Sequence, residues 1–295
     1  VCSSDLGMVD ISIVIVSWNA KDYLLACLRS IRQTQGGLSV EVVVVDNASG
    51  DGSADAVAEQ FPETRLLRNA RNLGFAAANN QGIRETRGRH VFLVNSDVVV
   101  LEGCLQALVE FLDSHPQAGM IAPRIVNRDG SLQVSCREFP GIRNSLVAAL
   151  GVEGLSRWSR FFRGAFMDWW SHDSVREVDV LSGCFWAIRR EALDSVGLLD
   201  ELFFIYGEDV DWCRRFHDAG WKVLLFPGAQ AIHFGGASSA NAPTRFYIEM
   251  QKARLQYWRK HHGPSGQAAC WAIIFLHQCV RVISRSVGCV IQPSR

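Results

Sequence analysis

The sequence has no excess of charge of either sign, because its 30 Lys and Arg residues balance its 30 Asp and Glu residues. Proteins that bind nucleic acid through its phosphates usually carry a basic surface, so we expect no nucleic-acid partner. The nine cysteines include no Cys-x-x-Cys pair, and their number is odd. We therefore expect free thiols in a reducing cytoplasm rather than a disulfide framework or a zinc site.

Several common catalytic signatures are also missing. No Gly-x-Gly-x-x-Gly follows the first predicted strand, and the chain has no Gly-x-x-x-x-Gly-Lys-Ser/Thr and no Gly-x-Ser-x-Gly. These absences disfavour dinucleotide binding, phosphate-loop NTPases and serine hydrolases. Residues 1–7 lack the basic start and the apolar stretch of a signal peptide. Because Met8 stands directly before the first patterned segment, we expect residues 1–7 to be a non-native leader.

Apolar residues make up 48% of the chain, which is enough for a substantial core. Strand-like runs alternate with segments of helical spacing, which predicts an α/β fold with a mostly parallel central sheet and helices on both faces. Ligands of such sheets bind beyond the carboxyl ends of the strands, where Asp46 and Asp97 lie. The predicted strands include Ile11–Ser17, Val40–Asp46, Arg65–Arg68, His90–Asn95, Met120–Ala122, Phe185–Ile188 and Lys222–Phe226.

Two regions depart from this pattern. Residues 124–177 are rich in arginine and aromatic side chains, and they predict either a mobile lid or an acceptor-facing insertion. The apolar stretch from Ala268 to Ile283 is interrupted by Gln278 and Arg281. A spanning helix needs about 20 apolar residues. This stretch is therefore either an ordinary packed helix or a helix at a membrane surface.

Two carboxylates follow predicted strands, and each has two readings. Asp46 begins an Asp-, Ser- and Gly-rich turn before a helix. Its carboxylate either accepts the imide N–H of a uracil or thymine ring or stabilises the turn. Asp97 ends the segment Asn95-Ser96-Asp97 and is either a ligand of a divalent cation or a capping residue.

Three further segments place polar or small residues at helix starts or strand ends. Gly74 either lets the backbone approach a ligand closely or forms a tight loop. Glu208 and Asp209 begin a predicted helix, where a carboxylate can either take a proton from a hydroxyl or simply cap the helix. Asp211 is assigned the capping role. His233 is either a ligand or a hydrogen-bonded structural residue.

Taken in order, these segments resemble the family 2 glycosyltransferases of the GT-A fold, especially bacterial rhamnosyltransferase-like members. The resemblance covers roughly residues 10–240 and rests on the ordered set rather than on any one motif. The matching motifs are Ile-Val-Ser-Trp-Asn at 15–19, Val-Val-Asp-Asn-Ala-Ser at 44–49, Asn-Leu-Gly-Phe-Ala-Ala-Ala-Asn-Asn at 72–80, Leu-Val-Asn-Ser-Asp at 93–97, Leu-Ser-Gly-Cys-Phe-Trp-Ala-Ile-Arg-Arg-Glu-Ala-Leu at 181–193, Phe-Ile-Tyr-Gly-Glu-Asp-Val-Asp-Trp-Cys at 204–213, Gly-Trp-Lys-Val at 220–223 and His-Phe-Gly-Gly-Ala-Ser at 233–238.

The resemblance implies a role for each matching residue. Asp209 would be the catalytic base, and Asp97 and His233 would hold Mg²⁺ or Mn²⁺. The motif at 95–97 reads Asn-Ser-Asp instead of Asp-x-Asp, so one carboxylate is missing and metal binding is expected to be weaker. The implied donor-binding residues are Ser17, Asn19, Asp46, Asn72, Gly74, Asn79 and Ser96, and the implied acceptor-side residues are Gly183, Trp186 and Glu208.

The resemblance also implies an activity and its setting. We expect a metal-dependent, inverting transfer of a sugar, such as rhamnose from dTDP-rhamnose, to a hydroxyl of a glycan or a lipid-linked glycan. A GT-A domain would span residues 8–245, followed by a C-terminal helical region at 246–295. The expected location is the cytoplasm, including the inner face of the cell membrane if the C-terminal helix meets lipid.

Two alternatives stay open at this point. In the first, the enzyme transfers another hexose or an N-acetylhexosamine from a UDP-sugar. In the second, the chain is a catalytically silent binding protein with the same fold. Because Asp97, Asp209 and His233 are all present, the sequence favours an enzyme.

Overall fold

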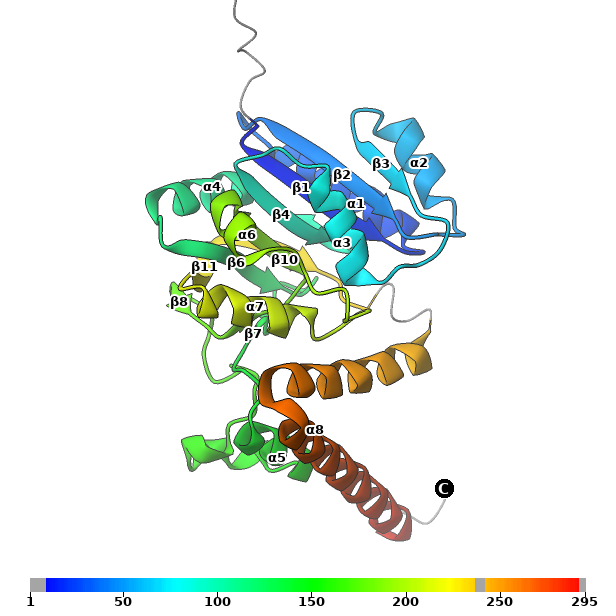
Figure 1. Ribbon diagram of the computed structural model, residues 1–295. Helices are drawn as coiled ribbons and strands as arrows, with labels where there is room; N and C mark the ends of the chain where they lie inside the picture. The colour runs from blue at the N-terminus through cyan, green and yellow to red at the C-terminus, as the bar shows by residue number, and fades with distance from the viewer. Residues whose placement is uncertain (1–8, 237–241, 292–295) are drawn as a thin grey trace, which may run out of the picture.

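The computed structural model describes residues 9–236 and 242–291, with side chains up to Ser284, so the predicted leader 1–7 lies outside the described residues. One half of the central sheet is parallel (Figure 1). Its strands lie in the order β3 (Arg65–Arg68), β2 (Val40–Asp46), β1 (Ile11–Ser17) and β4 (His90–Asn95). These four ranges agree with the sequence prediction. For β1, β2 and β4 the reason is a run of apolar, partly β-branched residues, which gives a strong strand signal.

The other half of the sheet is mixed. Strand β10 (Phe185–Arg189) runs antiparallel to both β4 and β6 (Ala118–Val126). Strand β11 (Lys222–His233) is parallel to β6 and antiparallel to the short strands β5 (Val98–Val100) and β8 (Arg176–Glu177). The carboxyl ends that we expected to form the site belong to the parallel half.

Helices cover both faces of the sheet, which confirms the predicted α/β class. One face packs against α1 (Lys21–Thr34), α2 (Ser53–Gln60) and α4 (Cys104–Ser114). The other face packs against α3 (Phe75–Arg84), α6 (Arg190–Val196) and α7 (Glu208–Asp218). Helix α3 lies so close to β1 that a Cβ on Gly82 would come within 2.3 Å of Val14 Cγ1. Only glycine fits there.

The region 124–177, where the sequence pattern loosens, contains regular structure. Strand β6 continues through Pro123 to Val126, and β7 (Cys136–Arg137) pairs with β9 (Val180–Leu181). Helix α5 (Ile142–Leu150) and the 3₁₀ helices η1 (Glu153–Arg157) and η2 (Arg160–Phe162) follow β7. Figure 1 shows α5 beside the second half of α8 (Pro243–Ile291), away from the sheet.

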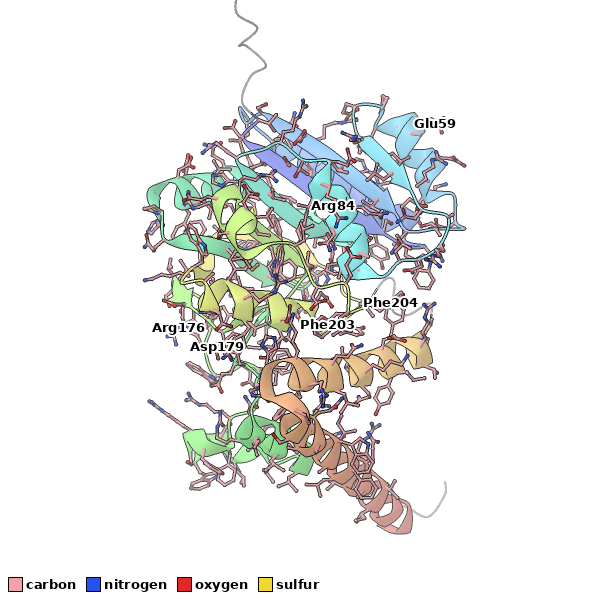
Figure 2. All side chains as sticks on the ribbon, viewed as in Figure 1. Glu59, Arg84, Arg176, Asp179, Phe203 and Phe204 are labelled. Carbon is pink, nitrogen blue, oxygen red and sulfur yellow. The ribbon has the colours of Figure 1, made fainter. Side chains whose placement is uncertain are left out.

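Helix α8 is divided in two by a kink. Gly263 has φ +67° and precedes Pro264, and both features break regular helix geometry. The first half passes beside α7 and the loop before it. Figure 2 shows Phe203 and Phe204 of that loop facing this half, where Arg245 lies over the Phe204 ring.

The second half of α8 has features of both alternatives that the sequence left open, a packed helix and a helix with an exposed apolar side. Cys270 and Ile273 are buried, so one side packs as in an ordinary helix. Trp271 and Phe275 are 60% and 58% exposed, so another side faces outward. By length and composition alone, α8 is long and apolar enough to cross a membrane. Its most apolar stretch of 18 residues has a mean hydropathy of 1.3, and 11% of that stretch is buried.

Candidate active site

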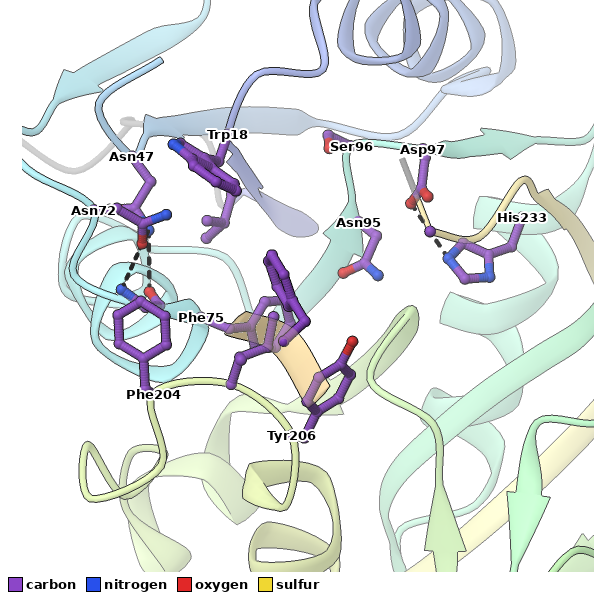
Figure 3. Close-up of a pocket in the computed structure, with 15 residues that line it drawn as sticks. Trp18, Asn47, Asn72, Phe75, Asn95, Ser96, Asp97, Phe204, Tyr206 and His233 are labelled. Atoms are coloured by element: carbon purple, nitrogen blue, oxygen red, sulfur yellow. Dashed lines mark hydrogen bonds and ion pairs between the residues drawn. The ribbon is translucent and has the colours of Figure 1, made fainter. Parts of the chain in front are cut away.

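A pocket of about 240 Å³ opens at the carboxyl edge of the parallel strands (Figure 3). The ends of β1 and β4, the loops before α3 and α7 and the start of α8 form its walls. Trp18, Tyr206 and Phe246 form an aromatic cluster on one side, with ring centroids 6.1 and 6.2 Å apart. Such a wall can stack a flat ring.

The loop before α3 is held by asparagine side chains and by a tight backbone contact. Asn47 donates to Asn72 Oδ1 at 3.0 Å and to the Gly74 carbonyl at 3.2 Å. Gly74 has φ +89°, and a Cβ there would lie 2.3 Å from the Phe204 carbonyl oxygen. Glycine therefore serves a close approach at this site, and the group that approaches is the backbone of the loop before α7.

Ser17 and Asp46 lie side by side at the ends of β1 and β2, directly behind the pocket wall. Both are buried, and Ser17 Oγ and Asp46 Oδ1 have no hydrogen-bond partner within the described part of the chain. The other Asp46 oxygen accepts the Ser49 N–H at 3.1 Å. A buried acceptor without a partner is costly unless a ligand or water satisfies it. Neither side chain lines the pocket itself.

Two other predicted donor-binding residues hold the local structure. Asn19 Oδ1 accepts the Gly50 N–H at 2.7 Å, which ties the loop after β1 to the loop after β2. Asn79 is buried within α3 and donates to the Phe75 carbonyl at 2.9 Å. Neither side chain lies on the pocket wall, whereas Asn72, Gly74 and Ser96 do.

Asp97 and His233 meet at the edge of the pocket because β5 pairs with the end of β11. Val98 lies opposite His233 in this pairing, and the Phe234 N–H donates to the Asp97 carbonyl at 3.0 Å. As a result, His233 Nε2 lies 3.2 Å from Asp97 Oδ1 (Figure 3).

Gln133 fixes the other side of the His233 ring. Its Oε1 lies 2.6 Å from His233 Nδ1, and its Nε2 donates to the His233 carbonyl at 3.1 Å. Because the amide nitrogen is used in this way, the amide oxygen faces Nδ1 and accepts its proton. The Nδ1 hydrogen bond turns Nε2 toward Asp97, and metal-binding histidines are commonly held by such a bond through their other ring nitrogen.

The pair fits a divalent cation that is shared with phosphate. Within residues 9–236 and 242–284, no group of three or more His, Cys, Asp or Glu side chains could hold a metal ion. Asp97 and His233 would therefore be the protein ligands. Mg²⁺ at phosphate sites commonly uses only one or two carboxylates and takes its other ligands from phosphate and water. The donor set thus suits an ion bound together with a diphosphate.

A second pocket of about 330 Å³ adjoins the first and shares Asn95, Tyr206 and His233 with it. Glu208 and Asp209, at the start of α7, line this second pocket. Asp209 forms an ion pair with Arg137 of β7, and its Oδ1 accepts the Val210 N–H at 2.8 Å.

Glu208 has a different environment from its neighbour. It is buried, and its Oε2 has no partner among the described residues. Burial and the nearby charge of Asp209 raise the pKa of Glu208 to about 8. Burial therefore favours the protonated form of Glu208, whereas the carboxylate of Asp209 is paired with Arg137.

Residues 12–197 match the sequence model of a family described as Glycosyl transferase family 2. The chain belongs to this family. One relative is N-acetylglucosaminyl-diphospho-decaprenol L-rhamnosyltransferase of Mycobacterium tuberculosis, which is 32% identical over 76% of this chain and 76% of its own length. Another is dTDP-rhamnosyl transferase RfbF of Shigella flexneri, which is 26% identical over 76% of this chain and 72% of its own length.

Solved structures share the fold of this glycosyltransferase. Mannosyltransferase PcManGT from Pyrobaculum calidifontis, in complex with GDP-Man and Mn²⁺, has a TM-score of 0.57 and 16% identity, with 97% of this chain and 81% of that one covered. GalNAc-T7 with UDP, GalNAc and Mn²⁺ also has a TM-score of 0.57 and 16% identity. That match covers 78% of this chain but only 44% of the GalNAc-T7 chain. The GT-A fold predicted from the motifs is confirmed.

The glycosyltransferase does not expose every residue predicted for the acceptor side. Gly183 lines the second pocket. Trp186 is fully buried, donates to the Leu181 carbonyl at 3.2 Å and packs edge-on against Trp212. The structure thus places Trp186 in the core rather than on the acceptor side, because β10 is a central strand covered on both faces. Its ring supports the pocket wall from behind, since a Cβ on Gly183 would lie 3.2 Å from it.

Two residues of the site carried no signal in the sequence. Gln133 and Arg137 both lie in the region 124–177, where no periodic pattern identifies a buried or pocket-facing position. Each acts on a residue distant in sequence, Gln133 on His233 and Arg137 on Asp209. Only the folded chain shows these contacts.

Proposed function

We propose that this glycosyltransferase uses a divalent cation to transfer a sugar from a nucleoside-diphosphate donor to a hydroxyl of a lipid-linked glycan, with inversion at the anomeric carbon. Rhamnose from dTDP-rhamnose is the donor that we favour, because the relatives in M. tuberculosis and S. flexneri are named for rhamnosyl transfer. The reaction would take place on the cytoplasmic side of the cell membrane. The proposal depends chiefly on the Asp97–His233 pair, which lies where the two pockets meet.

The first pocket suits the donor nucleotide. The free Asp46 oxygen would accept the imide N–H of a pyrimidine ring, and Ser17 would add a second polar contact. The aromatic cluster would cover a face of the ring. Asp97 and His233 would hold Mg²⁺ or Mn²⁺, which when bound would neutralise the charge of the departing diphosphate.

The second pocket suits the acceptor. Asp209 would take the proton of the attacking hydroxyl, while Arg137 holds the carboxylate in position. The acceptor oxygen forms a bond to the anomeric carbon as the bond from that carbon to the diphosphate oxygen breaks on the opposite face. The nucleoside diphosphate leaves with the bonding electron pair, and the configuration inverts. Positioning of both partners would supply much of the rate.

A thermal-shift screen tests this proposal, since selective donor binding stabilises the folded state. We expect dTDP-rhamnose with Mn²⁺ to raise the Tm more than UDP-glucose, UDP-N-acetylglucosamine or GDP-mannose does. Asp97→Ala should abolish the Mn²⁺-dependent part of the shift and also donor hydrolysis. Asp129→Ala changes an exposed loop carboxylate and should match the wild type.

Two results of the screen would change the conclusion. A largest shift with a UDP-sugar would assign the enzyme to transfer of another hexose or an N-acetylhexosamine. Donor hydrolysis at the wild-type rate by the Asp97→Ala variant would show that Asp97 is not a metal ligand. The proposal would then lose its main support.

A further inference from the structure

A third cavity, of about 340 Å³, lies between α5 and the first half of α8. Its walls are mainly apolar and include Pro140, Ala148, Met250, Ala253 and Trp258. We call this cavity the α5–α8 groove. It shares Arg137, Phe166, Tyr206 and Asp209 with the second pocket, so the groove is continuous with the proposed acceptor site.

Small residues keep the groove open. Helix α5 presents Ala148 to the groove together with Asn144 and Ser145, which precede it by four and three residues and therefore lie on its side of the helix. Ala253 of α8 faces the loop before α7, where a Cβ on Gly207 would lie 3.1 Å from the Ala253 Cβ. Larger side chains at these positions would fill the space between the two helices.

The groove also carries positive charge. Arg137 and Arg254 line it, and Asp209 is the only carboxylate that lines it within the described part of the chain. Because Asp209 is already paired with Arg137, the charge of Arg254 is not balanced by another lining residue. Guanidinium groups suit phosphate oxygens, since they donate two parallel hydrogen bonds.

Apolar side chains near both helices are also exposed outside the groove. Trp158 and Phe161, which follow α5, are 78% and 61% exposed, and Trp271 and Phe275 on α8 are exposed to a similar degree. Residues 250–295 contain lysine and arginine but no Asp or Glu. A basic surface with exposed aromatic side chains is typical of proteins that bind an anionic membrane.

We propose that the α5–α8 groove binds the polyprenyl diphosphate end of a membrane-held acceptor. Isoprene units would lie between α5 and α8, the diphosphate would contact Arg254, and the sugar would reach Asp209. The proposal rests on the proposed transfer to a lipid-linked glycan and names the part of the molecule that recognises the lipid. A hydrocarbon chain gains free energy when apolar walls remove it from water, and a diphosphate gains it from guanidinium contacts.

Binding of geranylgeranyl diphosphate to the full chain in mild detergent tests the groove. We expect wild-type protein to bind this probe and Ala148→Trp, which fills the groove, to weaken binding by at least about tenfold. Ala148 is exposed, so the larger side chain should not disturb the core. The matched control is Ala58→Trp, because Ala58 is an exposed residue of a helix, α2, that does not line the groove.

A second pair of variants tests the diphosphate contact. Arg254→Gln should weaken binding of geranylgeranyl diphosphate by at least about fivefold and leave binding of geranylgeraniol, which has no phosphate, unchanged. Arg259→Gln is the control, because Arg259 is exposed on the same helix and does not line the groove.

Donor hydrolysis by the same proteins separates this proposal from the proposed function. We expect Ala148→Trp and Arg254→Gln to hydrolyse the donor at the wild-type rate, since neither residue lines the donor pocket. The groove assignment is overturned if wild-type protein binds neither probe, or if Ala148→Trp binds the diphosphate normally, and donor hydrolysis would then still support a glycosyltransferase with another acceptor site. Absence of donor hydrolysis in the wild type would instead contradict the proposed function.

Discussion

At the residue scale, neighbouring groups hold the side chains of both His233 and Asp209 in fixed positions. Gln133 engages His233 Nδ1, so Nε2 is directed toward Asp97. The Val210 N–H and Arg137 hold the carboxylate of Asp209. Fixing a side chain in this way lowers the cost of ordering it when a ligand binds.

Gln133→Leu should weaken metal binding. The substitution keeps a side chain of similar size but removes the acceptor for the Nδ1 proton of His233, so the ring is free to rotate or change tautomer. Loss of such a partner typically costs about 10–100-fold in metal affinity. Mn²⁺ affinity in the presence of a nucleoside diphosphate, measured by electron paramagnetic resonance, checks this expectation.

The control for that variant is Gln106→Leu. Gln106 is an exposed residue of α4 that bonds only Glu110 among the described residues, so its loss should leave Mn²⁺ binding unchanged. Equal Mn²⁺ affinity in the Gln133 variant and the wild type would show that His233 is oriented without Gln133.

Asp209→Asn should lower turnover and leave donor binding intact. The amide keeps the shape of the side chain but cannot take a proton, and loss of a general base costs about 10²–10⁴-fold in rate. Glu208→Gln should cost less, because Glu208, with a pKa of about 8, is already mostly protonated at neutral pH. Transfer rates of both variants at saturating donor provide the measurement. A normal rate for Asp209→Asn together with loss of activity in Glu208→Gln would move the base to Glu208.

At the element scale, an ionic cluster around the buried Asp211 joins α7 to α8. Asp211 is fully buried, and it contacts Lys260 and His261 of α8 at 2.7 Å and Arg215 of its own helix at 3.0 Å. The capping role assigned to Asp211 from the sequence is therefore replaced by a clamp between helices. The clamp fixes the first half of α8 beside the loop that precedes Glu208.

Asp211→Asn should destabilise the protein by about 3–5 kcal/mol, because Lys260 and Arg215 would face a neutral amide in place of the buried carboxylate. Asp218→Asn removes an exposed ion pair with Arg214 and should cost less than about 1 kcal/mol. Urea unfolding at pH 7 compares the two variants with the wild type. Similar small losses in both would show that the cluster contributes little to stability.

The clamp should also depend on pH. Burial alone would raise the pKa of Asp211, but hydrogen bonds from His261 and Lys260 and the charge of Arg215 outweigh burial and lower it below the ordinary 3.8. Its contribution to stability is therefore fully present above pH 3.8 and is lost as the pH falls through the lowered native value.

At the scale of the whole molecule, the sheet domain carries the site, and α5 with the second half of α8 extends away from it (Figure 1). This extension exposes aromatic side chains, among them Trp271 and Phe275, whose rings stack 5.7 Å apart. The domain division at residues 245 and 246 and the membrane contact of α8 stay predictions. Both can be tested through this exposed pair.

Replacing Trp271 and Phe275 together by serine should reduce binding to anionic liposomes by at least about tenfold, because each large apolar side chain contributes about 1.5–3 kcal/mol when it leaves water. Substitution is a sharper test than truncation, since Cys270 and Ile273 beside the pair are buried. The control is a double substitution of Val175 and Leu202, which are also exposed, by serine. Liposome co-sedimentation is the assay, and equal binding by all three proteins would exclude α8 as the contact.

The sequence by itself determined the parallel half of the sheet and predicted the residues of the site. Strands β1, β2 and β4 were predicted to the residue, because long apolar β-branched runs have few other stable conformations. The motifs also identified the GT-A fold and named Asp97, His233 and Asp209. The strand patterns and the motifs are local properties, since each depends on which residue types stand a few positions apart in the chain.

The tertiary structure decided which of these residues meet. Strand β5 is three residues long, and the part of β11 beyond the bulge after Phe226 had no clear pattern, yet the pairing of these two segments brings Asp97 to His233. The burial of Trp186 follows from helices on both faces of β10, which its own sequence cannot show. Helix α5 is short and gains its stability from packing on α8. Each outcome depends on contacts between segments far apart in the chain, and a sequence pattern records only near neighbours.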